Sequence, residues 1–186
     1  LFLPRTVSWQ VNDGTSLSIP ATSIIRVNYA PILSDVANSI SFSEGSAAQV
    51  LDSTITVIDT RGENMESATI TISNGYVSGE DVLAFNNANG ITGVWDAESG
   101  KLTLSGAATA TIAVYEAALE SVTYQNLNDE GPNPLTRTVS WIIEDGTSPS
   151  SAVTSFIGVN SAPSITDVDG TLAFTEGAPA KIVDDS

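Results

Sequence analysis

The chain has 186 residues, 22 acidic and only six basic, and its net charge of −16 makes nucleic acids and anionic membranes poor partners, because both attract Lys and Arg. It contains no Cys and no His, which excludes disulfides, Cys zinc sites, thiol nucleophiles and the commonest general base. No stretch is long and apolar enough to span a bilayer, so we expect no direct membrane insertion.

Alternation of apolar and polar residues predicts short strands along most of the chain. The segment Asn12-Asp13-Gly14-Thr15 predicts a hairpin turn after the first strand, and Asn74-Gly75 predicts another turn. Pro31 lacks an N–H, so we expect it to end the pairing of the second strand. In chain order the expected strands are 5–11, 22–28, 39–43, 54–58, 67–73, 82–85, 91–95, 101–105, 121–125, 137–143 and 154–159.

One segment, 111–119, has helical character instead. Ile112, Tyr115, Ala118 and Leu119 recur at the spacing of one helical face. We therefore expect a single short helix there.

The sequence repeats itself. The segment 137–148 restates 5–16 at a distance of 132 residues, and aligning 1–54 with 133–186 gives 25 identities without a gap. Such self-similarity predicts a tandem-repeat protein. We expect residues 1–28 to be the C-terminal strands of a preceding repeat, 29–160 a complete repeat, and 161–186 the N-terminal part of the following repeat.

The complete repeat is long enough to bury its own core. Many short strands with turn signals between them predict an all-β sandwich with one short helix per repeat. The repeat boundaries, 27–31 and 159–163, both contain Asn and Pro.

Acidic residues stand at the predicted strand ends, where they would gather at the two poles of a sandwich. Asp13 and Asp145 are repeat copies before Gly, as are Glu44 and Glu176, while Asp59 stands close to Glu63 and Asn64. Calcium takes six to eight oxygen ligands from such carboxylates, amides and carbonyls. The alternative is that Asp-Gly pairs form turns and that the charge maintains solubility.

Enzymatic chemistry finds no support in the sequence. A glycosidase needs two carboxyl groups across a cleft, and no pair is singled out. A Ser nucleophile would lack its His base. Trp9 and Trp141 lie on apolar strand faces and are expected in cores, whereas Trp95 is the better candidate for stacking on a sugar.

The repeat resembles the cadherin-like tandem repeats of large bacterial surface adhesins. The resemblance rests on the Asp145-Gly146 turn, the strand 154–159, and the linker Asn160-Ser161-Ala162-Pro163 that follows. In addition, 96–102 is similar to the Asp-x-x-Thr-Gly-x-Leu hairpin of that family, and Glu44 matches its acidic residue after the first strand.

This resemblance implies an immunoglobulin-like/cadherin-like Greek-key β-sandwich with calcium at the junctions between repeats. Arg61, however, stands where the family has a second Asp, and the linkers lack the flanking aspartates of the family. The implied ligands are Asn28, Glu44, Asp59, Asp145 and Asn160, with Asp13 and Glu176 in the same roles in neighbouring repeats.

The expected function is that of a structural extender module in a long, secreted or cell-surface adhesin that supports adhesion and biofilm formation. Its partners would be the neighbouring repeats of the same chain, and no enzymatic activity is expected. The alternative is a carbohydrate-binding or self-associating β-sandwich, with Trp95, Tyr76 or Tyr115 as its exposed aromatic residues.

Overall fold

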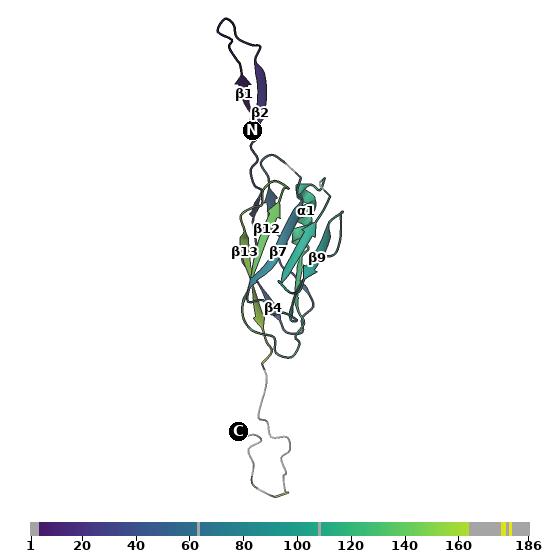
Figure 1. Cartoon of the computed structure of the whole chain (residues 1–186). Helices are drawn as coiled ribbons and strands as arrows, with labels where there is room; N and C mark the ends of the chain where they lie inside the picture. The colour runs from purple at the N-terminus through teal and green to yellow at the C-terminus, as the bar shows by residue number, and fades with distance from the viewer. Residues whose placement is uncertain (1–3, 63, 108, 164–175, 178, 180–186) are drawn as a thin grey trace.

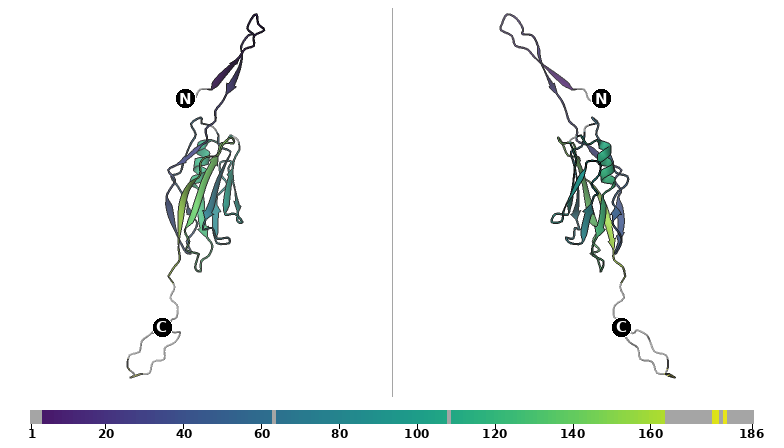
Figure 2. Two further views of the ribbon diagram at one scale, coloured as in Figure 1. Left: turned by 60° about the vertical axis from the view of Figure 1, so that its left-hand side comes forward. Right: turned by 90° about the vertical axis from the view of Figure 1, so that its right-hand side faces the viewer.

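The computed structural model describes residues 4–62, 64–107, 109–163, 176–177 and 179. A two-stranded hairpin and a β-sandwich body follow one another along the chain (Figure 1). The segment 26–31 joins the body at one pole, which we call the entry pole, and the last strand leaves it at the opposite end, the exit pole (Figures 1 and 2).

The body consists of short strands and one helix, and the hairpin consists of β1 and β2. The elements are β1 (Arg5–Trp9), β2 (Ala21–Ile25), β3 (Ile32–Ser34), β4 (Ser39–Ser43), β5 (Gln49–Val50), β6 (Thr56–Ile58), β7 (Ser67–Asn74), β8 (Asp81–Ala84), β9 (Thr92–Asp96), β10 (Lys101–Ser105), α1 (Ile112–Glu120), β11 (Thr123–Asn126), β12 (Arg137–Glu144) and β13 (Val153–Asn160).

A six-stranded sheet in the order β4-β13-β12-β7-β10-β9 forms one layer. The second layer covers one face of this sheet and consists of the sheets β5-β11-β8 and β3-β6 together with α1 (Figure 2). The first long strand of the body, β4, pairs in parallel with the last, β13, with Phe42 opposite Val159. The start and the end of the repeat are therefore joined within one sheet.

The alternating pattern of β12 and β7 places the core between the layers. Along β12 every second residue is buried, and Trp141 pairs in register with Ile70 of β7. Phe42 and Tyr124 reach across the core in an edge-to-face contact with ring centroids 5.2 Å apart. At the end of β7, Gly75 has a φ of 73°, and a Cβ there would lie 2.4 Å from the carbonyl oxygen of Thr136, so the turn requires glycine.

The all-β sandwich with one short helix is confirmed. The helix begins one residue later than predicted, and Tyr115, Ala118 and Leu119 of the predicted face are buried. Two strands were missed, β3 and β5. The two-residue β5 is too short to show a period, and β3 begins directly after Pro31, which restricts pairing only at its own position.

The hairpin β1–β2 reproduces the side-chain bonds of the hairpin β12–β13. The indole of Trp9 donates to Ser23 Oγ at 3.0 Å, as the indole of Trp141 donates to Ser155 Oγ at 2.9 Å. Burial differs, because Trp9 is 60% exposed whereas Trp141 is fully buried. The expectation that Trp9 is a core residue is therefore wrong for the described chain: the same local fold lacks an opposing layer. The third expected segment, 161–186, lies mostly outside the described residues.

These two tryptophans give a matched test of the fold. Trp141→Ala should lower the free energy of unfolding by about 3–5 kcal/mol, because it opens a large cavity in the core. Trp9→Ala should leave it nearly unchanged. Urea unfolding followed by far-ultraviolet circular dichroism measures both, and equal losses would contradict the exposed position of the hairpin.

Candidate junction sites at the two poles of the sandwich

The entry pole is organised by the turn after β12. Asp145 Oδ1 accepts hydrogen bonds from the backbone N–H groups of Thr147 and Ser148, both at 2.7 Å. This leaves Oδ2 to accept a bond from the side-chain amide of Asn28 at 2.8 Å. Burial acts to raise the pKa of Asp145, but the bonds from Asn28 and the turn outweigh it and hold the pKa below its ordinary value.

A second contact at this pole comes from the loop after β6. Asp59 Oδ1 accepts a bond from the backbone N–H of Arg61 at 2.7 Å, which orders the loop. The guanidinium of Arg61 then donates from Nη1 to the carbonyl oxygen of Val27 at 2.5 Å. The segment before the body is thus held at two neighbouring residues, Val27 and Asn28.

The oxygen atoms at the entry pole can be compared with the ligands that calcium requires. The side-chain oxygen of Asn28 is buried and has no hydrogen-bond partner among the described residues, and such an oxygen suits a hard cation. Asp59 and Asp145 would add carboxylates. No cluster of three or more His, Cys, Asp or Glu occurs within the described part of the chain, so backbone carbonyls and water would have to supply the remaining ligands.

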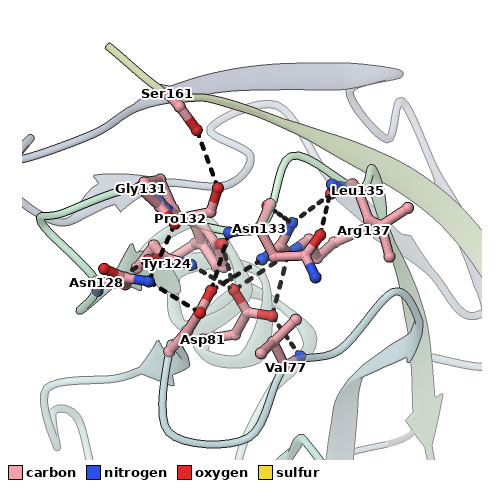
Figure 3. Close-up of polar contacts among 12 residues, drawn as sticks. Val77, Asp81, Tyr124, Asn128, Gly131, Pro132, Asn133, Leu135, Arg137 and Ser161 are labelled. Carbon is pink, nitrogen blue, oxygen red and sulfur yellow. Dashed lines mark hydrogen bonds and ion pairs between the residues drawn. The ribbon is translucent and has the colours of Figure 1, made fainter. Parts of the chain in front are cut away.

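At the exit pole, Glu44 fixes the chain that leaves the body. Its backbone N–H donates to the carbonyl oxygen of Asn160 at 3.0 Å. Its carboxylate accepts one bond from the N–H of Ala162 at 2.5 Å and another from the N–H of Gly131 at 2.9 Å. Ser161 adds a bond from its hydroxyl to the carbonyl oxygen of Pro132 at 2.9 Å (Figure 3).

The loop that carries Gly131 and Pro132 rests on a buried ion pair (Figure 3). Arg137 Nε lies 3.1 Å from Asp81 Oδ2, and neither side chain is exposed. The Asp81 carboxylate also accepts bonds from Tyr124, Asn126 and the N–H of Val77 at 2.6, 3.0 and 2.8 Å. Four donors therefore compensate this buried charge.

Arg137 carries the connection from the ion pair to the loop. Its Nη1 donates to the carbonyl oxygens of Asn133 and Leu135. Glu80 holds the same loop from the other side, accepting bonds from the side chain of Asn128 at 3.0 Å and the N–H of Asn133 at 3.2 Å. The bond from Asn128 is the main reason that the pKa of Glu80 lies below its ordinary value.

The structure separates the predicted ligands into two groups. Asn28, Asp59 and Asp145 lie at the entry pole, and Glu44 and Asn160 lie at the exit pole. Asp13 accepts bonds from the N–H groups of Thr15 and Ser16 within its own turn. Glu176 lies in an exposed turn, and Glu63 lies outside the described residues.

Sequence reasoning missed the buried pair Asp81–Arg137. Arg137 has the same parity as Val139, Trp141 and Ile143, which all face the core, so strand alternation predicts an inward guanidinium. Its partner was not visible in the sequence, because Asp81 is 56 residues away from Arg137.

The aromatic residues offer less for sugar binding than the sequence suggested. Tyr115 is fully buried, so its proposed exposure is wrong. Tyr76 and Trp95 pack edge to face against each other with centroids 6.1 Å apart, and both also contact the core.

No helix in the described part of the chain is long and apolar enough to cross a membrane.

Comparison with known proteins finds a distant similarity. Models of known protein families give no match. Halomucin of Haloquadratum walsbyi (strain DSM 16790 / HBSQ001) is 31% identical over 133 residues, covering 68% of this chain and 2% of halomucin. The chain therefore spans a small part of a very long relative, and the matched length is close to the 132-residue period. The β-rich body fits a repeat module, while membership of the cadherin-like family stays a prediction.

Removing one member of the buried ion pair should be costly. Asp81→Ala should lower the free energy of unfolding by about 3–5 kcal/mol, because it leaves the buried Arg137 guanidinium with only the more distant carboxylate of Glu80, which lies 3.8 Å from Nη2. Asp129→Ala removes the same charge from an exposed position of the exit loop and should have little effect. Urea unfolding measures both, and a small loss for Asp81→Ala would contradict the dependence of Arg137 on Asp81.

Tyr124 predicts how stability responds to alkaline pH. Burial, reinforced by the bond to Asp81, raises the pKa of Tyr124 well above its ordinary value. The unfolded chain loses this proton near pH 10 while the folded chain keeps it, so the stabilisation is complete below about pH 10 and is lost as the pH rises further. Tyr124→Phe should make this alkaline decline shallower in unfolding curves between pH 8 and about 11, and an unchanged slope would contradict the contribution of Tyr124.

Proposed function

We propose that this chain is a non-enzymatic spacer from a long repetitive protein of the cell surface, in which consecutive repeats extend end to end. The observation that carries the proposal is the position of the two linkers at opposite poles of the body (Figure 1). Repeats joined in this way lengthen a rod instead of folding back on one another.

The repeated sequence supports a serial arrangement. The hairpin before the body has the indole bond and the aspartate turn of the hairpin that ends the body. An isolated two-stranded hairpin is marginally stable in water, so we infer that β1–β2 completes a preceding body of the same kind. Such a body would cover the exposed apolar face around Trp9.

Charge and comparison support a surface location. Halomucin is very long relative to the matched segment, and its name describes a mucin. A net charge of −16 disfavours aggregation and binding to nucleic acid. Both properties suit a spacer that keeps other segments of the protein away from the cell surface. Adhesion and biofilm formation would then belong to the whole protein, with the spacer presenting other segments.

The rod-like arrangement can be tested by small-angle X-ray scattering. Chains of two, three and four consecutive 132-residue repeats should show a maximum dimension that rises in proportion to the number of repeats. Growth as the cube root of mass would indicate compact packing and would contradict the spacer function.

We further propose that calcium strengthens the entry pole, with Asn28, Asp59 and Asp145 as ligands. Binding to the folded state alone would add about 2.7 kcal/mol at about 100 times the dissociation constant, and extracellular modules bind calcium with constants of about 0.1–1 mM.

The measurement is thermal unfolding of the chain in excess calcium and in excess chelator. Calcium should raise the midpoint for the unmodified chain and for Asp96→Asn, an exposed aspartate at the end of β9, but much less for Asp145→Asn. Identical curves for the unmodified chain under both conditions would restrict the acidic turns to a structural and solubilising role.

A further inference from the structure

The two linkers are near-copies that the same fold holds in different ways. Residues 27–31 read Val-Asn-Tyr-Ala-Pro and residues 159–163 read Val-Asn-Ser-Ala-Pro. The first is seen where it meets the entry pole, and the second where it leaves the exit pole (Figure 1). Together they show both sides of one junction.

The exit pole holds a linker through its backbone beyond the valine. Glu44 N–H binds the carbonyl oxygen of Asn160, and the Glu44 carboxylate binds the N–H of Ala162. Gly131, by donating to the other carboxylate oxygen, fixes Glu44 in this position. The bond from Ser161 to Pro132 is specific to this linker, since Tyr29 stands at the equivalent place.

The entry pole holds a linker through other atoms. Arg61 binds the carbonyl oxygen of Val27, and Asp145 binds the side-chain amide of Asn28. Asn28 corresponds to Asn160, whose backbone carbonyl, and not its side chain, is used at the exit pole. Placing both sets of bonds on one linker therefore uses no atom twice.

On this basis, and resting on the proposed end-to-end arrangement, we propose that each junction is a clamp built from protein groups alone. The upstream repeat holds the linker with its Glu44, and the downstream repeat holds the same linker with its Arg61 and Asp145. Each pole therefore binds the linker that joins it to the adjacent repeat, and it faces the pole of that repeat.

The neighbouring repeat segments retain the two matching carboxylates. Asp13 stands at the place of Asp145 and makes the same turn bonds, which leave Oδ2 available for a linker amide. Glu176 stands at the place of Glu44. Arg61 supplies the positive charge that an acidic junction requires. The stiffness of the junction therefore does not depend on a metal ion, although calcium can add stability.

Pulsed electron–electron double resonance on the 186-residue chain tests the entry side. The chain has no cysteine, so Ile25→Cys at the end of β2 and Ser105→Cys at the end of β10 give one defined pair of spin labels. In chelator, the distance distribution should be narrow. Arg61→Ala should widen it towards the reach of a free linker of five residues, about 12 Å, whereas Arg26→Ala, an exposed arginine in the same segment, should not.

Amide hydrogen exchange tests the exit side. Glu44→Ala should accelerate exchange at Ala162 and Gly131 in chelator, while Glu130→Ala, an exposed neighbour with the same charge, should leave both amides unchanged. Circular dichroism checks that each variant keeps its fold. Faster exchange confined to these two amides supports the clamp, and unchanged exchange in Glu44→Ala overturns it.

The outcomes separate the clamp from the spacer function. A distribution that is narrow only with calcium, or equally broad in the unmodified chain and Arg61→Ala, overturns the clamp, and the scattering of multi-repeat chains then decides the spacer function independently. Compact multi-repeat chains would contradict the spacer function, and a narrow label distribution in them would confine the proposal to the contact between one linker and the entry pole.

Discussion

The buried ion pair between Arg137 and Asp81 is the interaction on which the exit half of the molecule depends. Removing two charges from water is expensive, and the cost is offset only when each charge has its partners in place. Here the partners come from several elements: Asp81 begins β8, Tyr124 and Asn126 belong to β11, and Arg137 begins β12. The pair therefore ties the two layers together and fixes the loop against which the outgoing chain lies.

The two poles use similar chemistry for different ends. In each, a carboxylate at the end of a strand accepts bonds from backbone N–H groups and keeps capacity for the linker. At the entry pole Asp145 shapes its own turn with one oxygen and binds Asn28 with the other. At the exit pole Glu44 binds Gly131 with one oxygen and Ala162 with the other. A module with both arrangements is suited to serial connection, because each end fixes the direction of the chain that passes through it.

The sequence predicted the local elements well where side chains alternate between two environments. Strands β7, β10 and β12 and the face of α1 were found because every second residue, or every third and fourth, is buried. The short strands β3 and β5 were missed, since two or three residues carry no measurable period. Asp145 and Glu44 lie at opposite poles because each follows the end of a strand, and strand ends gather at the ends of a sandwich.

What the sequence by itself determined is the period of 132 residues, the all-β class with one helix, and the turns and linkers that recur at each boundary. These are properties of local pattern and self-similarity, which need no long-range contact. Only the tertiary structure decided that Trp9 is exposed while Trp141 is buried, that Arg137 meets Asp81, and that Arg61 reaches Val27. Each depends on which distant segment lies opposite, and pairing across tens of residues is fixed by the packing of whole layers.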